Sequence, residues 1–131
     1  MKESGRTNAS RTKTAAVVED DEDLVFIYSR ILKDVGYDSV FVARSGEEII
    51  HWISTDMRSL DVVIMDYRLP KINGLDAARE VVRHSPETKI IMATAHDEIK
   101  AEAESLGFSF LRKPFSMKTL AKEMRRPALI V

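Results

Sequence analysis

The sequence predicts an α/β fold in which a parallel sheet is covered by helices on both of its faces. Five short apolar runs alternate along the 131 residues with segments whose apolar residues recur at helical spacing. The runs are rich in apolar residues, which is typical of strands that are buried on both faces. Strands that alternate with helices in this way form parallel sheets. Five such units in succession therefore predict one three-layer domain.

The composition is that of an ordinary globular protein and excludes several classes. Twenty basic and 21 acidic residues leave a net charge of −1, so the overall charge does not indicate binding to nucleic acid. The absence of cysteine excludes disulfides and thiolate metal sites. No apolar run approaches the roughly 18 residues of a membrane span, and the N-terminus lacks the apolar core of a signal peptide. We expect a cytoplasmic protein that contacts neither membrane nor nucleic acid directly.

The first helix is expected between the first two strands. Apolar residues recur at helical spacing over residues 24–35, and Gly36 stands where a C-terminal cap belongs. Residues 21–23 are acidic and are expected to cap this helix, because the dipole at a helix N-terminus favours negative charge. The five expected strands are 15-AAVV-18, 39-SVFVA-43, 61-DVVIM-65, 89-KIIMAT-94 and 108-FSFLR-112.

The other four helices carry their own start and stop signals. Ser45 and Glu48 form a capping-box pattern at the start of the second helix. Asn73 and Gly74 make the turn into the third helix. Helical spacing, glycine and proline place the third, fourth and fifth helices at about 75–85, 97–106 and 116–126.

The two ends of the chain fall outside this pattern. Residues 1–13 are polar, with four basic residues and one acidic residue, and we expect a flexible basic leader before a folded domain at 14–126. A basic arm that contacts nucleic acid is the less favoured alternative. The tail, 127–131, contains the apolar segment 128-ALIV-131. That segment extends the packing of the fifth helix, precedes a second domain or contacts a partner, and the sequence does not choose among these.

Polar side chains follow the predicted strands at one edge of the sheet. Glu19 and Asp20 follow the first strand, and Asp66 follows the third. Thr94 ends the fourth strand, and Lys113 follows the fifth. In open parallel sheets the functional crevice lies beyond the carboxyl ends of the strands. Each residue alone has an ordinary structural explanation, such as a loop cap or an exposed charge, but their coincidence at successive strand ends indicates a common site.

The chemistry of these residues fits phosphoryl transfer. Close carboxylates repel one another, and Mg²⁺ relieves that repulsion through oxygen ligands (Mn²⁺ is an alternative). An Asp66 carboxylate beside such a metal can attack a phosphorus centre and give an acyl phosphate. Lys113 would neutralise charge on the transferring phosphoryl group, and the Thr94 hydroxyl would donate a hydrogen bond to it.

The segments that carry these residues resemble the receiver domain of two-component response regulators. They are VVEDD, VVIMDYRLPKINGLDA, IMATA and FLRKPF, and the resemblance extends over about 14–126. It implies a flavodoxin-like, doubly wound (βα)5 fold with strand order 2-1-3-4-5. It also implies that Asp66 accepts a phosphoryl group from a sensor histidine kinase in a Mg²⁺-dependent reaction. The domain would then change conformation and signal to an output domain or partner protein.

The same resemblance assigns roles around Asp66. Glu19 and Asp20 are the acidic pair, and with Asp66 and the backbone carbonyl of Arg68 they are expected to hold Mg²⁺. Lys113 matches the lysine of receiver sites, and the bond from Lys113 to the following proline is expected to be cis.

Thr94 and Phe110 match the two switch positions of receivers. Phosphorylation would draw the Thr94 hydroxyl toward the phosphoryl group, and the Phe110 ring would swing into the vacated space. Phe110 has an alternative interpretation as a core residue. Arg68 and His96 stand at the variable positions that flank the phosphorylation site and are expected to tune the lifetime of the phosphorylated form. For His96, a solvated loop residue is the alternative.

Two departures from the family affect the expected output surface, which the fourth helix, fifth strand and fifth helix form in receivers. Only 18 residues separate Thr94 from Lys113, fewer than in most receivers, so the fourth helix should be short or displaced. The segment 107-GFSFLRKPF-115 lacks the paired acidic residues of receivers that dimerise through this face. We therefore do not predict that dimer.

Enzymes with an aspartyl-phosphate intermediate are the main alternative. Haloacid-dehalogenase-type phosphatases need a second aspartate two residues after the nucleophile, where this sequence has Arg68. A DNA-binding regulator has no support within these residues, since no helix-turn-helix pattern follows Arg126. A receiver that never accepts phosphate is disfavoured, because every expected site residue is present. The sequence predicts a signalling domain that catalyses only its own phosphorylation and dephosphorylation.

Overall fold

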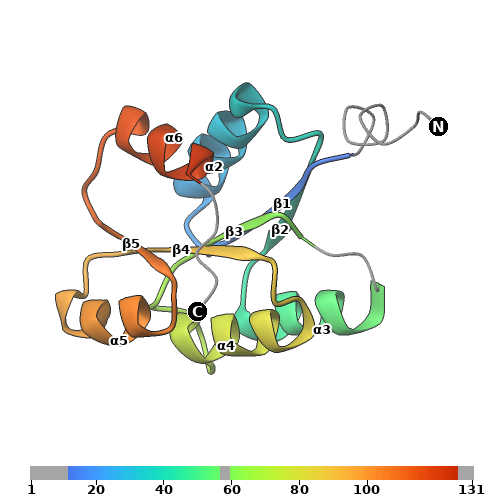
Figure 1. The fold of residues 1–131 in the computed structure, drawn as a ribbon, viewed down its shortest axis with the longest axis vertical. Coiled ribbons are helices and arrows are strands. Elements are labelled where there is room, and N and C mark those ends of the chain that lie inside the picture. Colours follow the sequence, from blue (N-terminus) through green and yellow to red (C-terminus); the bar gives the residue numbers. More distant parts are fainter. Residues whose placement is uncertain (1–11, 57–59, 127–131) are drawn as a thin grey trace.

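The structure is a computed structural model that describes residues 12–56 and 60–126. Its centre is a sheet of five parallel strands in the order β2-β1-β3-β4-β5 (Figure 1). This confirms the predicted flavodoxin-like (βα)5 fold and its strand order. The strands are β1 (Thr14–Val18), β2 (Ser39–Ala43), β3 (Val62–Met65), β4 (Lys89–Thr94) and β5 (Ser109–Arg112).

Helices cover both faces of the sheet. On one face lie α2 (Glu22–Val35) and α6 (Met117–Arg125), which pack beside each other (Figure 1). The opposite face is covered by α3 (Gly46–Asp56), α4 (Gly74–His84) and α5 (Lys100–Ser105). A 3₁₀ turn, η1 (Asp97–Ile99), leads into α5. The result is the predicted three-layer arrangement.

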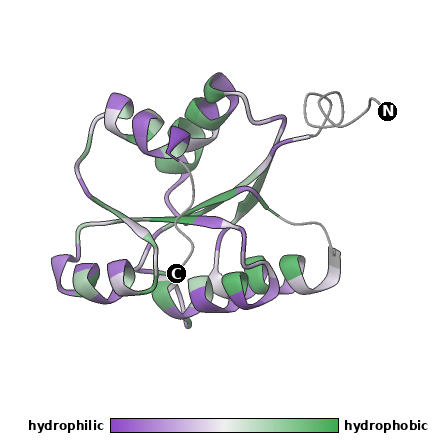
Figure 2. Ribbon diagram, in the orientation of Figure 1, coloured by the Kyte–Doolittle hydropathy of each residue, from purple (hydrophilic) through white to green (hydrophobic). Residues whose placement is uncertain are grey.

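β1, β3 and β4 are buried along almost their whole length and are rich in apolar residues (Figure 2), because each of their faces belongs to a hydrophobic core. In β1, Ala15 and Val17 pack into the core under α2 and α6. Their neighbours Ala16 and Val18 pack into the core on the other side. Successive side chains of a strand point to opposite faces, so burial on both sides requires apolar residues at every position.

The helix ends follow the local signals in the sequence. Asp21 caps α2, because its carboxylate accepts hydrogen bonds from the backbone N–H groups of Asp23 and Leu24 at 2.9 and 3.2 Å. Gly36 ends α2 with a φ of 118°, in the left-handed region that favours glycine. At Ser45, the hydroxyl accepts from the N–H of Glu48 at 3.2 Å. Both ends of α2 and the start of α3 thus lie where the sequence predicted them, and of the acidic residues 21–23 Asp21 is the N-cap while the other two lie in the first turn of α2.

The fourth helix differs most from its expected range. The sequence predicted a helix over about 97–106, whereas the structure has the η1 turn followed by only six residues of α5. The difference lies at the start, because α5 ends at Ser105, within one residue of the predicted end, and the N–H of Phe108 donates to the carbonyl of Ala103 at 3.0 Å just beyond it. The expectation of a short fourth helix is confirmed. The strand boundaries agree with the predicted ones to within one residue.

Parts of the predicted organisation lie outside the described residues. These are most of the basic leader, 1–13, and the apolar tail, 127–131, so their assignments stay predictions. Among the helices of the described ranges, none is both long and apolar enough to cross a membrane.

Candidate functional site

The carboxyl ends of β1, β3 and β5 bring the predicted site residues together. The N–H of Asp66 donates to the carbonyl of Val18 at 3.1 Å, so the ladder between β3 and β1 continues into the residue that follows β3. The N–H of Glu19 likewise donates to the carbonyl of Ala43 in β2 at 3.0 Å. The backbone of both Glu19 and Asp66 is therefore fixed by hydrogen bonds to neighbouring strands of the sheet.

Three carboxylates form a compact cluster at this edge. Glu19, Asp20 and Asp66 each contribute an oxygen, and these oxygens lie within 4.8 Å of one another. Glu19 is 2% exposed and Asp66 is 8% exposed, whereas Asp20 is exposed to solvent. An open cavity of about 560 Å³ lies over the cluster. It is lined by Glu19, Asp20, Asp21, Leu24, Asp66, Arg68, Leu69, Pro70 and Lys113.

Lys113 is the positive group of the cluster. Its Nζ lies 3.3 Å from Glu19 Oε1 and 3.7 Å from Asp66 Oδ2. The backbone places it there, since the N–H of Lys113 donates to the carbonyl of Thr94 at 2.9 Å. The bond between Lys113 and Pro114 is cis, as predicted.

Negative charge in the cluster is only partly compensated. Burial raises the pKa of Asp66, and the charge of Lys113 opposes this without cancelling it. Burial also raises the pKa of Glu19, and the neighbouring charge of Asp66 raises it further. Three oxygen donors with uncompensated charge fit a hard divalent cation, which prefers carboxylate ligands and keeps some of its waters.

Gly74 holds the loop that follows Asp66. The N–H of Gly74 donates to the carbonyl of Tyr67 at 2.8 Å. A Cβ at position 74 would lie 1.9 Å from the backbone oxygen of Asp66, which is closer than any contact allows. The sequence predicted a turn here, but the approach of this turn to Asp66 is visible only in the structure.

The model of the response regulator receiver domain family matches residues 15–125 of the chain. The chain belongs to this family. The match covers the five strands except for Thr14, the first residue of β1, and it includes the acidic cluster and Lys113.

Curated relatives of this receiver domain include two whole response regulators. UvrY of Escherichia coli (strain K12) is 42% identical over 81 residues, which are 60% of this chain and 36% of UvrY. SaeR of Staphylococcus aureus (strain USA300) is 33% identical over 109 residues, which are 79% of this chain and 45% of SaeR. The chain thus spans less than half the length of these curated relatives.

Solved receiver structures share the fold over almost their full length. The BeF3-activated receiver domain of DrrB, a Thermotoga maritima protein, has a TM-score of 0.76 and 27% identity, covering 88% of this chain and 97% of that one. The chemotaxis protein CheY4 of Vibrio cholerae has a TM-score of 0.75 and 28% identity, covering 89% of this chain and 99% of CheY4.

Thr94 lies at the same edge of the receiver sheet but does not line the cavity over the carboxylates. It ends β4 and is 1% exposed. Its Oγ1 accepts a hydrogen bond from the N–H of His96 at 3.3 Å. The structure thus places Thr94 beside the site, where its hydroxyl oxygen accepts one hydrogen bond from the following loop.

The two predicted modulators contact each other. Arg68 Nη1 lies 3.5 Å from His96 Nε2, and His96 Nδ1 lies 3.1 Å from Glu98 Oε2. Arginine has only donors, so Nε2 is the acceptor in the first contact. The N–H of Arg68 also donates to Asp66 Oδ1 at 3.4 Å. Sequence spacing did not indicate the contact between Arg68 and His96, because these residues meet only through the packing of two loops. Glu98 follows His96 by two residues, so its contact with His96 is local.

Phe110 is half-buried and packs against the core under α3, α4 and α5. Both of its sequence interpretations, a core residue and an aromatic switch, are compatible with this position. The backbone carbonyl of Arg68 as a metal ligand also stays a prediction.

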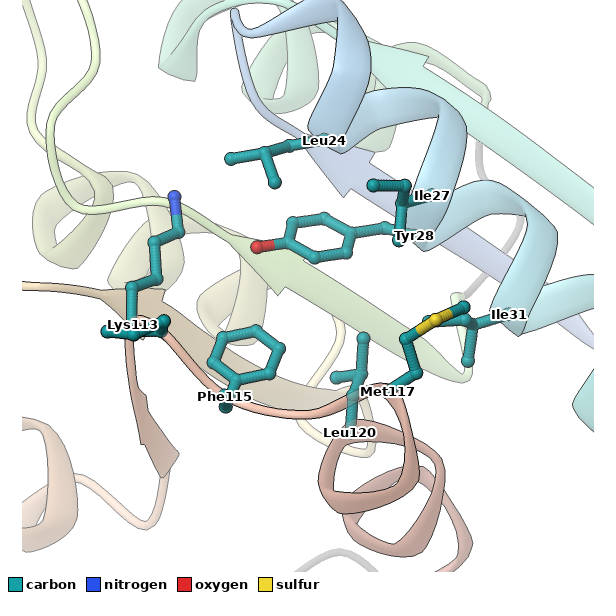
Figure 3. A pocket seen from close by; sticks show the side chains of 9 residues that line it. Leu24, Ile27, Tyr28, Ile31, Lys113, Phe115, Met117 and Leu120 are labelled. Carbon is teal, nitrogen blue, oxygen red and sulfur yellow. The ribbon is translucent and has the colours of Figure 1, made fainter.

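A second cavity lies next to the site and was missed by the sequence analysis. It has a volume of about 280 Å³ and is bounded by α2, the segment 113–115 and the start of α6 (Figure 3). The signal that could have found it is Tyr28, which stands between Leu24 and Ile31 at helical spacing and so belongs to the inner face of α2. The lining residues are Leu24, Ile27, Tyr28, Ile31, Lys113, Pro114, Phe115, Met117 and Leu120.

Proposed function

We propose that this receiver domain accepts a phosphoryl group on Asp66 from a sensor histidine kinase, in a reaction that needs Mg²⁺ or Mn²⁺. It then changes conformation and signals to an output domain or partner protein. The observation that carries the proposal is the buried Asp66 carboxylate, grouped with two further carboxylates and the Lys113 ammonium at the edge of the sheet. The DrrB receiver, which is similar to this chain, has been solved in a BeF3-activated form, and this also supports the proposal.

The proposed reaction needs an acceptor, a charge partner and a metal site. An Asp66 oxygen forms the new bond to phosphorus while the bond from phosphorus to the donor histidine nitrogen breaks, and that nitrogen keeps the electron pair. The Lys113 ammonium stabilises the charge of the transferring group. Glu19, Asp20, Asp66 and the Arg68 carbonyl would hold the metal, which supplies positive charge against the phosphoryl oxygens.

The switch would begin at Thr94. Its hydroxyl would leave the N–H of His96 and donate to the phosphoryl group, and the half-buried ring of Phe110 would follow. The affected surface is formed by α5, β5 and α6, which we propose as the output face. Arg68 and His96 would set the phosphoryl lifetime, because their mutual contact lies beside the path to Asp66.

The test is the intact mass of the protein after incubation with Mg²⁺ and acetyl phosphate. We expect one added phosphoryl group in the wild type and none in Asp66→Asn or after Mg²⁺ is chelated. Asp76→Asn is the matched control, because Asp76 is an exposed aspartate on α4 away from the cluster, and it should still be phosphorylated.

If the wild type shows no adduct, release of inorganic phosphate distinguishes rapid dephosphorylation from a failure to accept the phosphoryl group. Steady Mg²⁺-dependent release that Asp66→Asn abolishes would mean rapid dephosphorylation and would support the proposal. Neither an adduct nor phosphate release would overturn it.

A further inference from the structure

Tyr28 is a buried aromatic residue next to the receiver site. It lies on the inner face of α2 and is 3% exposed. Its ring stacks on that of Phe115, with ring centroids 6.1 Å apart and an interplanar angle of 15°. Phe115 follows Lys113 by only two residues, so the stacked pair joins α2 to the segment that carries the ammonium group.

The two cavities share a wall at this point. Leu24 and Lys113 line both the open cavity over the carboxylates and the apolar cavity that contains Tyr28. In Figure 3 the phenol hydroxyl points toward the side on which the Lys113 side chain lies. Burial raises the pKa of Tyr28, and the negative charges of Glu19 and Asp66 raise it further, which agrees with a hydroxyl close to the cluster.

Lys113 needs support that its own side chain cannot supply. A lysine side chain is a flexible stem of four carbons, and its ammonium here must stay within reach of both Glu19 and Asp66. The hydrogen bond from its N–H to Thr94 fixes the backbone on one side. On the other side the chain continues through Pro114 to Phe115, whose ring rests on Tyr28.

We propose that Tyr28 is a positioning residue for phosphoryl transfer, because its ring holds Phe115 and thereby keeps Lys113 beside Asp66. The inference rests on the proposed function of Asp66 as phosphoryl acceptor. A misplacement of about 1 Å at a reacting group lowers a rate by up to about 100-fold, so loss of this support should be visible in the kinetics.

The test compares phosphorylation rates by acetyl phosphate for three variants. Tyr28→Leu removes the stacked ring and should lower the rate at saturating Mg²⁺ by about fivefold or more. The Mg²⁺ concentration for half the maximal rate should change by less than about twofold, because the carboxylates stay in place. Tyr28→Phe keeps the ring and should restore the rate. Ile31→Ala is the matched control, since Ile31 lines the same cavity but has no ring that could stack on Phe115. This variant should lower the melting temperature but leave the phosphorylation rate unchanged.

Coupling to Lys113 separates a positioning role from a merely structural one. In a Lys113→Ala background, Tyr28→Leu should change the remaining rate by less than about twofold, because the group it positions is already absent. Phe115→Leu should reproduce the loss seen for Tyr28→Leu, and it serves as the second variant if Tyr28→Leu does not fold.

Two results would overturn the inference. One is a wild-type rate in both Tyr28→Leu and Phe115→Leu, and the other is an equal loss with and without Lys113. Failure of the proposed function would look different, since the wild type itself would then show neither an Asp66-dependent adduct nor phosphate release.

Discussion

At the scale of single residues, the site depends on backbone positions as much as on charged side chains. Gly74 shows this most directly, because it has no side chain that could take part in catalysis and yet lies against the backbone of Asp66. Its neighbour Asn73 caps α4 by accepting a hydrogen bond from the N–H of Asp76 at 2.9 Å. The cap and the glycine together bring the start of α4 against the loop that follows the acceptor aspartate.

Gly74→Ala should therefore damage both stability and phosphorylation. The added Cβ would lie 1.9 Å from the Asp66 oxygen, so the loop has to move. We expect a loss of about 1–3 kcal/mol or more in the free energy of unfolding, measured by urea denaturation. Phosphorylation of Asp66 by acetyl phosphate, followed by intact mass, should also be slower.

Gly46→Ala is the matched control for this substitution. Its Cβ would meet the Ala77 Cβ at 3.1 Å, a tight contact with a side chain instead of with backbone. The loss should be smaller, and phosphorylation should be unchanged. An unaltered urea midpoint for Gly74→Ala would contradict the tight approach to Asp66.

At the scale of elements, α6 is tied to the sheet at the end opposite to the site. Lys89, at the start of β4, is 8% exposed and donates to the carbonyls of Glu123, in the last turn of α6, and of Arg126, its C-cap. A cation at a helix C-terminus is favourable because of the helix dipole. The Lys89 ammonium also lies 3.6 Å from the Glu123 carboxylate, which accepts hydrogen bonds from Ser109 and Arg126.

This network predicts a pH-dependent contribution of Glu123 to stability. Burial would raise the pKa of Glu123, but the hydrogen bond from Ser109 and the charges of Lys89 and Arg126 together lower it below its ordinary value of 4.5. A carboxyl group whose pKa is lowered on folding stabilises the fold above its unfolded pKa and loses that effect as the pH falls through the folded pKa.

Glu123→Gln should lower the free energy of unfolding by about 1–3 kcal/mol at pH 7. The difference from the wild type should shrink as the pH falls below 4.5, as measured by urea denaturation at a series of pH values. Glu47→Gln, at an exposed position of α3, should stay within about 0.5 kcal/mol of the wild type. A difference that persists unchanged as the pH falls well below 4.5 would refute the role of the charge.

At the scale of the whole molecule, three carboxylates and one lysine gather at a single edge of the sheet. Folding places Glu19 and Asp66 in a setting that raises the pKa of both. A carboxyl group whose pKa is raised on folding stabilises the fold below its unfolded pKa, and this effect is lost as the pH rises through the folded pKa. At neutral pH the ionised cluster therefore opposes folding of the domain.

Mg²⁺ should consequently raise the thermal midpoint of the receiver domain at pH 7. At a concentration ten times its dissociation constant, a ligand that binds only the folded state adds about 1.4 kcal/mol, which corresponds to a shift of several degrees. Asp66→Asn should raise the midpoint in Mg²⁺-free buffer and weaken the response to added Mg²⁺. If the thermal midpoint of the wild type does not change with Mg²⁺ up to millimolar concentrations, the metal site is contradicted.

Much of the fold and of the site could be predicted from the sequence because the signals are local. Apolar runs mark strands, Asp21 and Asn73 mark helix starts, and Gly36 marks a helix end, each through an interaction within a few residues. The site residues could be placed because parallel strands bring their carboxyl ends to one edge. The start of α5 was harder to predict, since the 3₁₀ turn at Asp97–Ile99 leaves no signal distinct from that of an α-helix in so short a segment.

The sequence by itself determined the strand order through its resemblance to receivers, the acidic cluster with its lysine, and the positions of the caps. Only the tertiary structure decided which side chains from distant segments meet: Arg68 with His96, Tyr28 with Phe115, and Lys89 with Glu123. Such contacts depend on helix placement and loop packing to within about an ångström, and pattern and spacing along a chain do not carry distances of that precision.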